Sequence, residues 1–315
     1  MGKKVKFIEV RSEIGAGTRG ASLGVDAIKI AALDYGSDMF DRIGSVRVED
    51  ENEMLFKKVS HSYAKRIGGV LNIYERLTDT ISSSIKANEF PVVIAGDHST
   101  AGGTISGIRL ADPGKRVGVI WIDAHADIHS PYTTPSGNVH GMPLAAVLDE
   151  DNIELAVNSP SEQTIEEWEK LKNIGGVAPK VRYEDLVYIG VRDIEPEESH
   201  LLKKHNVKMI SVSEVKRNGV DKVSRQALAY LAHCDAIYIS FDVDSLDSSI
   251  SKGTGTPVRN GLSEKEASGL CVRLVQNSKV SCFELCEVNP TLDKENKMAE
   301  SSFEILQKVV SQITN

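Results

Sequence analysis

The sequence predicts an α/β fold with three layers, in which helices flank a central, mainly parallel β-sheet. One observation is that short segments such as residues 117–122 and 236–241 are almost continuously hydrophobic, as strands buried on both faces are. Another is that longer stretches between them carry apolar residues at three- and four-residue intervals, which is typical of amphipathic helices. Strands that alternate with helices favour β-α units with right-handed crossovers.

The expected elements follow in chain order. A strand at 5–10 precedes a glycine-rich loop and an amphipathic segment near 23–33, and a long helix is expected over 67–85 because its apolar residues keep helical spacing. The further strands are expected at 92–95, 117–122, 186–191, 207–212, 236–241 and 280–287. The further helices are expected near 222–233, 263–276 and 300–313.

Composition limits the class of protein. No linker rich in proline, glycine or serine divides the 315 residues, so we expect a single domain over residues 1–315. A net charge of -8 offers no basic stripe for nucleic acid. The start of the chain has no apolar signal core, and no stretch has the ~20 apolar residues of a membrane helix. We therefore expect a cytoplasmic protein without nucleic-acid or membrane partners.

The four cysteines, at positions 234, 271, 282 and 286, fit reduced thiols better than a disulfide framework. Cys282 and Cys286 lie on one expected strand at an even offset, which puts them on the same face. We interpret them as buried packing residues.

Acidic residues and histidines follow three of the expected strands at the point where each strand ends. Because the carboxyl ends of parallel strands form the ligand crevice of an open sheet, these side chains are expected to meet there. Carboxylate and imidazole donors without cysteine suit Mn²⁺, Co²⁺ or Zn²⁺, and this number of donors suits a pair of metal ions roughly 3.5 Å apart. The candidate metal ligands are His98, Asp123, His125, Asp127, Asp242 and Asp244.

These segments resemble the successive signatures of one enzyme family. The sequence reads GDHS at 96–99, DAHAD at 123–127, SFDVDSLD at 240–247, GTGTP at 253–257 and EVNP at 287–290. In order and spacing this is similar to the ureohydrolases, which include arginases, agmatinases and formimidoylglutamases, and the likeness runs from about residue 5 to 312. The resemblance implies an arginase-like three-layer fold, a binuclear manganese centre and hydrolysis of a guanidinium or related group.

Roles for the metal ligands follow from this resemblance. Asp123 and Asp242 are expected to bridge two Mn²⁺ ions. His98 with Asp127 completes one site, and His125 with Asp244 the other. Co²⁺ fits the same donors.

The resemblance also implies residues for chemistry and for recognition. Glu287 is expected to pair with the guanidinium, His140 to transfer a proton to the leaving amine, and Asp127 belongs to the catalytic set as well as to the ligands. The expected substrate-binding residues are His129, Thr134, Ser136, Asn138 and Glu195. His129 stands where many arginases have Asn, and Glu195 where Asp is frequent, while Asp193 is interpreted as a helix cap.

Donors for an α-carboxylate in the 128–143 loop favour arginase over agmatinase, since agmatine has no α-carboxylate. The resemblance therefore implies hydrolysis of L-arginine to L-ornithine and urea by a hydroxide that bridges two metal ions, in a homo-oligomer, either a trimer or a hexamer. The alternative is agmatinase or another guanidino or formimidoyl amino-acid hydrolase.

Three other functions fit the sequence less well. Residues 15–20 satisfy the GxGxxG pattern of dinucleotide-binding enzymes, but the pattern alone is weak and its context is poor. A deacetylase of the same fold class, with one Zn²⁺, would need neither His98 nor Asp244. A binding subunit that had lost its metals would lack ligands, and none is missing from the sequence.

Overall fold

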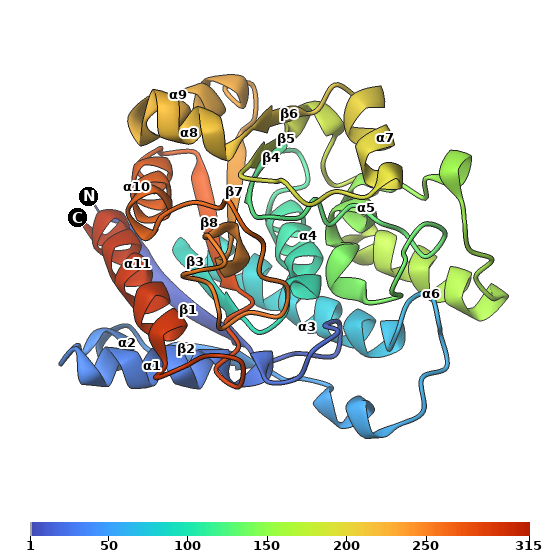
Figure 1. Cartoon of the computed structure of the whole chain (residues 1–315), viewed down its shortest axis with the longest axis horizontal. Coiled ribbons are helices and arrows are strands. Elements are labelled where there is room, and N and C mark those ends of the chain that lie inside the picture. The colour runs from blue at the N-terminus through green and yellow to red at the C-terminus, as the bar shows by residue number, and fades with distance from the viewer. Residues whose placement is uncertain (1) are drawn as a thin grey trace.

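The computed structural model describes residues 2–315, in which eight strands form one sheet (Figure 1). The strand order is β2-β1-β3-β8-β7-β4-β5-β6, and every neighbouring pair is parallel. The strands are β1 Lys4–Val10, β2 Ser45–Val48, β3 Glu89–Ala95, β4 Val117–Ile122, β5 Leu186–Ile189, β6 Lys208–Ile210, β7 Ala236–Asp242 and β8 Val280–Cys286. The predicted α/β fold with a parallel central sheet is confirmed.

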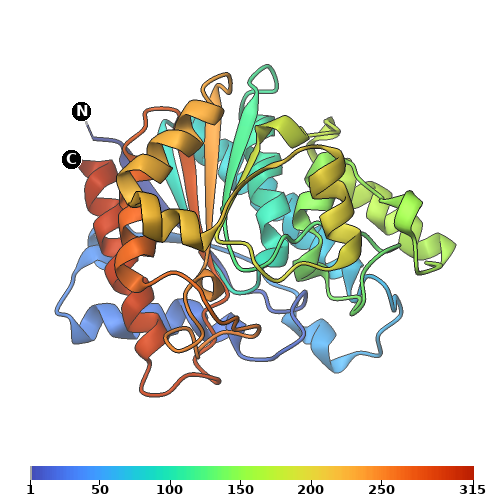
Figure 2. The same ribbon diagram turned by 45° about the horizontal axis from the view of Figure 1, so that its top comes forward.

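Helices connect the strands and cover both faces of the sheet. They are α1 Gly24–Asp34, α2 Met39–Ile43, α3 Ile67–Lys86, α4 Ala101–Ala111, α5 Pro143–Leu148, α6 Glu162–Lys172, α7 Pro196–Lys204, α8 Val212–Asn218, α9 Val220–Tyr230, α10 Glu264–Val275 and α11 Lys297–Thr314. One hydrophobic cluster joins the sheet to α1 and α8 to α11, and a second joins it to α3 to α7. Figure 2 shows the strands between these two helical layers. The two layers exclude water from both faces of the central strands, so that only the strand ends are open to ligands.

Several elements were not predicted from the sequence. Strand β2 is short and mostly exposed, so it lacks the apolar signal of its neighbours. Helix α4 contains three glycines, which lower helix propensity. The predicted strand at 207–212 extends too far. Strand β6 ends at Ile210, because Ser211 and Glu214 form a capping box that begins α8.

The glycines of α4 allow it to pack closely against α3. A Cβ atom on Gly102 would lie 2.2 Å from the hydroxyl of Tyr74, and one on Gly107 would lie 2.5 Å from Cβ of Ile81. The same Tyr74 hydroxyl donates a 2.6 Å hydrogen bond to the carbonyl of Ser99, in the turn that carries His98. The packing of α3 on α4 thus fixes the start of a candidate ligand segment.

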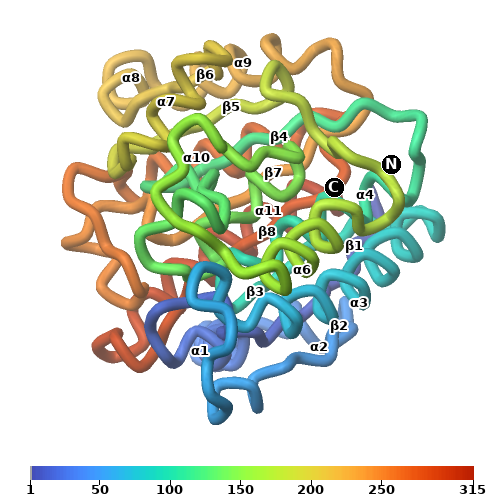
Figure 3. The backbone as a smooth tube through the Cα atoms, turned by 90° about the vertical axis from the view of Figure 1, so that its right-hand side faces the viewer, coloured from blue at the N-terminus to red at the C-terminus, as the bar shows by residue number. Residues whose placement is uncertain are grey.

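The two ends of the chain lie side by side (Figures 1 and 3). The backbone nitrogen of Lys3 donates a 2.8 Å hydrogen bond to the carbonyl of Ile313 at the end of α11. Within residues 2–315, no helix combines the length and apolar character needed to cross a membrane.

Candidate active site

The sheet order brings the predicted site residues together. Strands β3, β8, β7 and β4 are consecutive neighbours in the sheet, and His98, Glu287, Asp242 and Asp123 follow or end them at the same edge. Because all four strands are parallel, their carboxyl ends meet although the residues are far apart in sequence.

His98 lies at the centre of a carboxylate cluster. Its Nδ1 atom is 3.1 Å from Oδ2 of Asp123, 3.1 Å from Oδ2 of Asp127 and 3.2 Å from Oδ2 of Asp242. Nδ1 of His98 and Oδ2 of Asp123 are buried and have no hydrogen-bond partner among residues 2–315. Ligand atoms about 2.1 Å from one ion lie about 3.0–3.4 Å apart, so these four residues fit one divalent cation.

The His98 ring is held from two sides by residues that the sequence analysis did not single out. Its Nε2 atom is 2.7 Å from Oγ of Ser240, and its ring stacks on Trp121 at a centroid separation of 4.0 Å. A partner on the second ring nitrogen orients a histidine toward its metal. Both residues lie inside strands, where sequence alone indicates only burial.

A second group of possible ligands shares Asp123 with the first. Nδ1 of His125 is 3.0 Å from Oδ2 of Asp244 and 3.6 Å from Oδ1 of Asp123. The Thr256 hydroxyl donates a 3.0 Å hydrogen bond to Oδ2 of Asp244, and the backbone nitrogen of Ala124 donates to its Oδ1 atom at 3.1 Å. The two oxygens of Asp123 therefore face different groups, as a bridging carboxylate requires.

The carboxylates of this cluster repel one another, which favours the binding of cations. Burial, together with the charges of Asp244 and Asp123, raises the pKa of Asp242 well above its usual value. Two divalent cations would remove this repulsion and keep all the carboxylates ionised. Oδ2 of Asp242 lies 3.2 Å from His98, and Oδ1 accepts a 2.8 Å hydrogen bond from the backbone nitrogen of Asp244. The bridging role of Asp242 stays a prediction.

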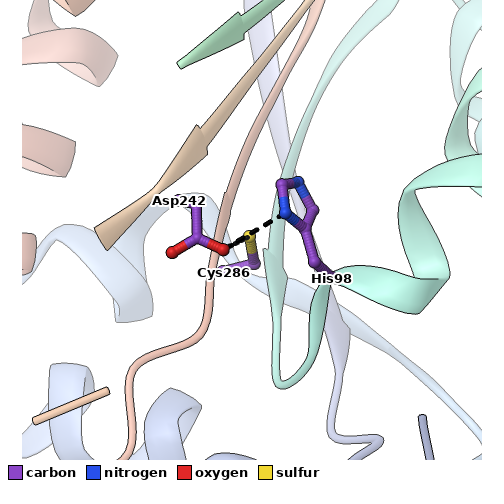
Figure 4. A group of neighbouring side chains, drawn as sticks. All are labelled: His98, Asp242 and Cys286. Carbon is purple, nitrogen blue, oxygen red and sulfur yellow. Dashed lines mark hydrogen bonds and ion pairs between the residues drawn. The ribbon is translucent and has the colours of Figure 1, made fainter. Parts of the chain in front are cut away.

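Cys286 lies beside the candidate metal ligands, a position that the sequence analysis did not predict. It is fully buried, as predicted, and it pairs with Asp242 in the register of β7 and β8. Figure 4 shows its sulfur beside Asp242 and His98, and the Sγ atom lies 3.7 Å from Oδ2 of Asp242. The thiol thus packs directly against the ligand cluster.

Glu287 and His140 form a pair beside the cluster. Nδ1 of His140 is 3.1 Å from Oε1 of Glu287, and the backbone nitrogen of His98 donates to the same oxygen at 2.9 Å. Glu287 and Asp127 have positive φ values, 66° and 48°, which non-glycine residues rarely adopt. Such strain is found at functional sites, where the surrounding structure holds the residue in place.

The 128–143 loop presents the predicted carboxylate-binding side chains. The Thr134 hydroxyl accepts a 2.9 Å hydrogen bond from the nitrogen of Gly137, and the Ser136 hydroxyl accepts one of 3.1 Å from the nitrogen of Asn138. Each hydroxyl therefore keeps its own hydrogen for another acceptor. The side-chain oxygen of Asn138 accepts a hydrogen bond from Lys65, which leaves its amide hydrogens available.

His129 and Glu195 lie together with Glu198. Nε2 of His129 is 3.5 Å from Oε2 of Glu195 and 3.8 Å from Oε2 of Glu198. The neighbouring His129 imidazole lowers the pKa of Glu195 to about 2. Asp193 was wrongly interpreted as a helix cap, because Glu195 and Glu198 form the capping box of α7. Asp193 instead lies 3.8 Å from His125.

One cavity, with a volume of about 290 Å³, connects these groups. Its lining includes five of the six candidate metal ligands, all three catalytic candidates and all five predicted substrate-binding residues. The sixth candidate ligand, Asp123, is buried and is not among the lining residues. The lining residues that carry the argument are His98, His125, Asp127, Asp242, Asp244, His140, Glu287, His129, Thr134, Ser136, Asn138 and Glu195. The volume and the polar lining suit a small, charged molecule.

Comparison with known proteins agrees with this geometry. The sequence matches the arginase family over residues 3–311, and it is 34% identical to the arginase of Brevibacillus brevis over 98% of each chain. The chain belongs to the arginase family. The solved arginase of Bacillus caldovelox is similar in structure, with a TM-score of 0.82 at 30% identity and 98% coverage of both chains. The formimidoylglutamase of Bacillus subtilis shares the fold, with a TM-score of 0.74 at 19% identity over 100% of this chain and 88% of the other.

In this arginase-family chain, the glycine-rich loop at 15–20 has another role than nucleotide binding. The backbone nitrogens of Gly20 and Ser22, which would face a phosphate, both donate to the Glu13 carboxylate, at 2.7 and 3.0 Å. The nitrogen of Gly15 donates to Asp97, and its carbonyl accepts from the nitrogen of His140. The loop thus supports the cavity wall, and the amides of Gly15 and Gly20, the first and last glycines of the pattern, are not free for a nucleotide.

Arg192 joins two of the loops around the site. Its guanidinium donates to the carbonyls of Asp244, Leu246 and Val258 at 2.9, 3.1 and 2.9 Å. It also reaches the carbonyl of Gly190 after β5. Arg192 thereby fixes the backbone of a candidate ligand, a role that sequence reasoning missed because it depends on main-chain atoms.

Proposed function

We propose that this protein is an arginase, which hydrolyses L-arginine to L-ornithine and urea within one catalytic domain spanning residues 1–315. The observation that carries the proposal is that a single cavity is lined by the ligand cluster and by the loop at 134–138. The ligand cluster would receive the guanidinium end of the substrate, and the loop would bind its amino-acid end.

The residues present fit two divalent cations, with Mn²⁺ expected and Co²⁺ compatible. His98, Asp127, Asp123 and Asp242 would hold one, and His125, Asp244 and the same two bridging carboxylates the other. When bound, such a pair lowers the pKa of water toward neutrality and so supplies a nucleophile at physiological pH.

Glu287 orients the substrate. Its Oε1 atom is occupied by the His98 nitrogen and by His140, so Oε2 is the oxygen available to the guanidinium. A charged carboxylate at this point fixes the guanidinium carbon relative to the nucleophile, which is an effect of orientation.

His140 holds the proton for the leaving amine. Burial disfavours its charged form, but the hydrogen bond and the charge of Glu287 outweigh burial and raise the pKa of His140 to about 9. With Nδ1–H directed at Glu287, the hydrogen on Nε2 is the one that can be donated to the departing nitrogen.

The amino-acid end of the substrate would contact the loop and α7. Thr134, Ser136 and Asn138 offer hydrogen-bond donors to an α-carboxylate. Glu195 and His129 line the same cavity, and the carboxylate of Glu195 would be the charge partner of the α-ammonium group.

The deciding experiment is an assay of Mn²⁺-loaded protein for urea release from L-arginine and from agmatine, each at matched concentrations. We expect kcat/KM for arginine to exceed that for agmatine by at least about tenfold, the value of one hydrogen bond to a charged group. Equal rates would contradict the assignment of the 134–138 loop. Activity on formimidoylglutamate without activity on arginine would indicate that the protein belongs to another branch of the family.

The native metal, a trimeric or hexameric assembly and a cytoplasmic location stay predictions. Metal analysis of protein purified without added metal, light scattering of the purified protein and cell fractionation test them in turn.

A further inference from the structure

His129, Glu195 and Glu198 form a compact group of possible ligands outside the carboxylate cluster of His98. One ligand atom from each residue lies within 4.8 Å of the other two. His129 is only 6% exposed, and its Nε2 atom has no hydrogen-bond partner among residues 2–315. The separations from Nε2 to the two carboxylates, 3.5 and 3.8 Å, are too long for good hydrogen bonds.

These separations suit a shared cation better than direct contact. Donor atoms about 2.0–2.1 Å from a tetrahedral ion lie about 3.3–3.4 Å from one another. The observed distances need only a few tenths of an ångström of adjustment to reach that geometry.

The two carboxylates lack another counter-charge. In the part of the chain that the structure describes, no lysine or arginine nitrogen lies within 4.0 Å of either carboxylate, and His129 is their one ion-pair partner. Glu198 is buried, so its negative charge is costly to leave unpaired. A divalent cation would neutralise both carboxylates at once.

The group is also held in place around the position that a cation would take. The Nδ1 atom of His129 is 3.0 Å from the Thr133 hydroxyl, which leaves Nε2 directed at the carboxylates. The oxygens of Glu198 accept hydrogen bonds from the nitrogens of Ile128 and Glu195, each at 3.2 Å. Fixed donors of this kind raise metal affinity because less order is lost on binding.

We propose that His129, Glu195 and Glu198 form a third divalent-cation site, separate from the predicted binuclear centre and suited to Zn²⁺. One imidazole and two carboxylates make up a three-ligand zinc set, and the cavity provides access to the fourth position. The site follows from the side chains themselves and does not depend on the proposed reaction. If that reaction is correct, the cation competes with the α-ammonium group of the substrate for Glu195.

The test is a count of bound metal. Protein first saturated with Mn²⁺ is equilibrated with about 50 µM ZnCl₂ and desalted, and total manganese plus zinc per chain is measured by mass spectrometry. Because total metal is counted, exchange of Zn²⁺ for Mn²⁺ at the binuclear centre does not change the result. The variants are His129→Asn, Glu195→Gln and, as a matched control, His200→Asn.

His200 is a suitable control because it also pairs with a glutamate, Glu154, at 3.0 Å, but on the exposed side of α7. We expect His129→Asn and Glu195→Gln each to bind one ion fewer per chain than the parent protein, and His200→Asn to bind the same number. The ions retained by the first two variants report that they have folded.

Equal totals in the parent protein and both site variants would overturn the proposal, and so would the loss of one ion from His200→Asn alone. Anomalous diffraction at the zinc edge gives the second measurement. A peak between His129 and Glu198 supports the site, whereas the absence of a zinc peak there contradicts it, whether or not zinc also occupies the binuclear centre. Neither result depends on turnover, so a failure here is distinguishable from a failure of the proposed activity.

Discussion

Oε1 of Glu287 lies 3.1 Å from Nδ1 of His140 and 2.9 Å from the backbone nitrogen of His98. One carboxylate oxygen thus connects the backbone of a candidate metal ligand to the candidate proton donor. This arrangement keeps His140 charged at neutral pH, and it couples the position of the donor to that of the metal ligand.

We expect His140→Ala to lower kcat on the order of 10²-fold with a much smaller change in KM, because a proton donor acts mainly on the departing amine. Metal content should stay at the parent level, and added imidazole should restore part of the rate. Loss of bound metal without rescue by imidazole would indicate a ligand role for His140 instead.

Replacing Glu287 by Gln should make the free energy of unfolding vary less as the pH rises from about 6.5 to about 9. The folded-state pKa of His140, about 9, lies above its usual value near 6.5, so the pair stabilises the fold fully below pH 6.5 and loses this contribution as pH rises through 9. We expect Glu287→Gln to cost on the order of 1–3 kcal/mol at pH 6 and much less at pH 10. Urea unfolding of EDTA-treated protein at both pH values measures it, and a cost that does not depend on pH contradicts the pairing.

Asp123→Asn should abolish activity and lower the metal content to one ion or none, since each oxygen of Asp123 faces a different ligand group. The matched control is Asp235→Asn, directly before β7 and so at the other edge of the sheet from the ligands. Within residues 2–315, the one hydrogen bond of its carboxylate is from the nitrogen of Arg116. The control should keep its metals. Full metal content with normal turnover in Asp123→Asn would rule out a shared ligand.

Thr134→Ala and Ser136→Ala should raise KM for arginine, each by about 10- to 150-fold, because each would remove a hydrogen bond to a charged group worth roughly 1.5–3 kcal/mol. Bound metal should be unchanged, as neither side chain belongs to the ligand cluster. The same substitutions should have little effect on agmatine, which makes that substrate an internal control.

Ser240→Ala should weaken metal binding by about 10- to 100-fold, because it would remove the partner on Nε2 that orients His98. Competition of the protein with a metal-sensitive dye gives the affinity directly. An unchanged affinity would show that stacking on Trp121 is sufficient to hold the ring.

The sequence was informative wherever a function depends on residue type at a strand end. The three ligand segments follow buried strands with strong apolar runs, so both their place and their chemistry were predictable. Sequence could not indicate Ser240 or Trp121 as partners of His98, because both lie inside strands whose pattern shows only burial. The contacts of Arg192 are with backbone carbonyl groups, which every residue has, so no residue type in the sequence indicates them.

The missed elements have similar causes. The glycines of α4 argue against a helix locally, and tertiary packing on α3 overrides them. The start of α7 could have been read from Glu195, Pro196 and Glu198, which form a capping box and a first-turn proline. The same signal would have corrected the interpretation of Asp193.

The close contact between α3 and α4 makes catalysis vulnerable at positions that touch neither ion nor substrate. Gly102 and Gly107 leave no room for a methyl group, and we expect the displacement that alanine would force there to shift the start of α4 and with it His98. A genetic screen for inactive variants should therefore recover these glycines alongside the ligands. A design that places the ligand residues in another scaffold would therefore also need the packed pair of α3 and α4.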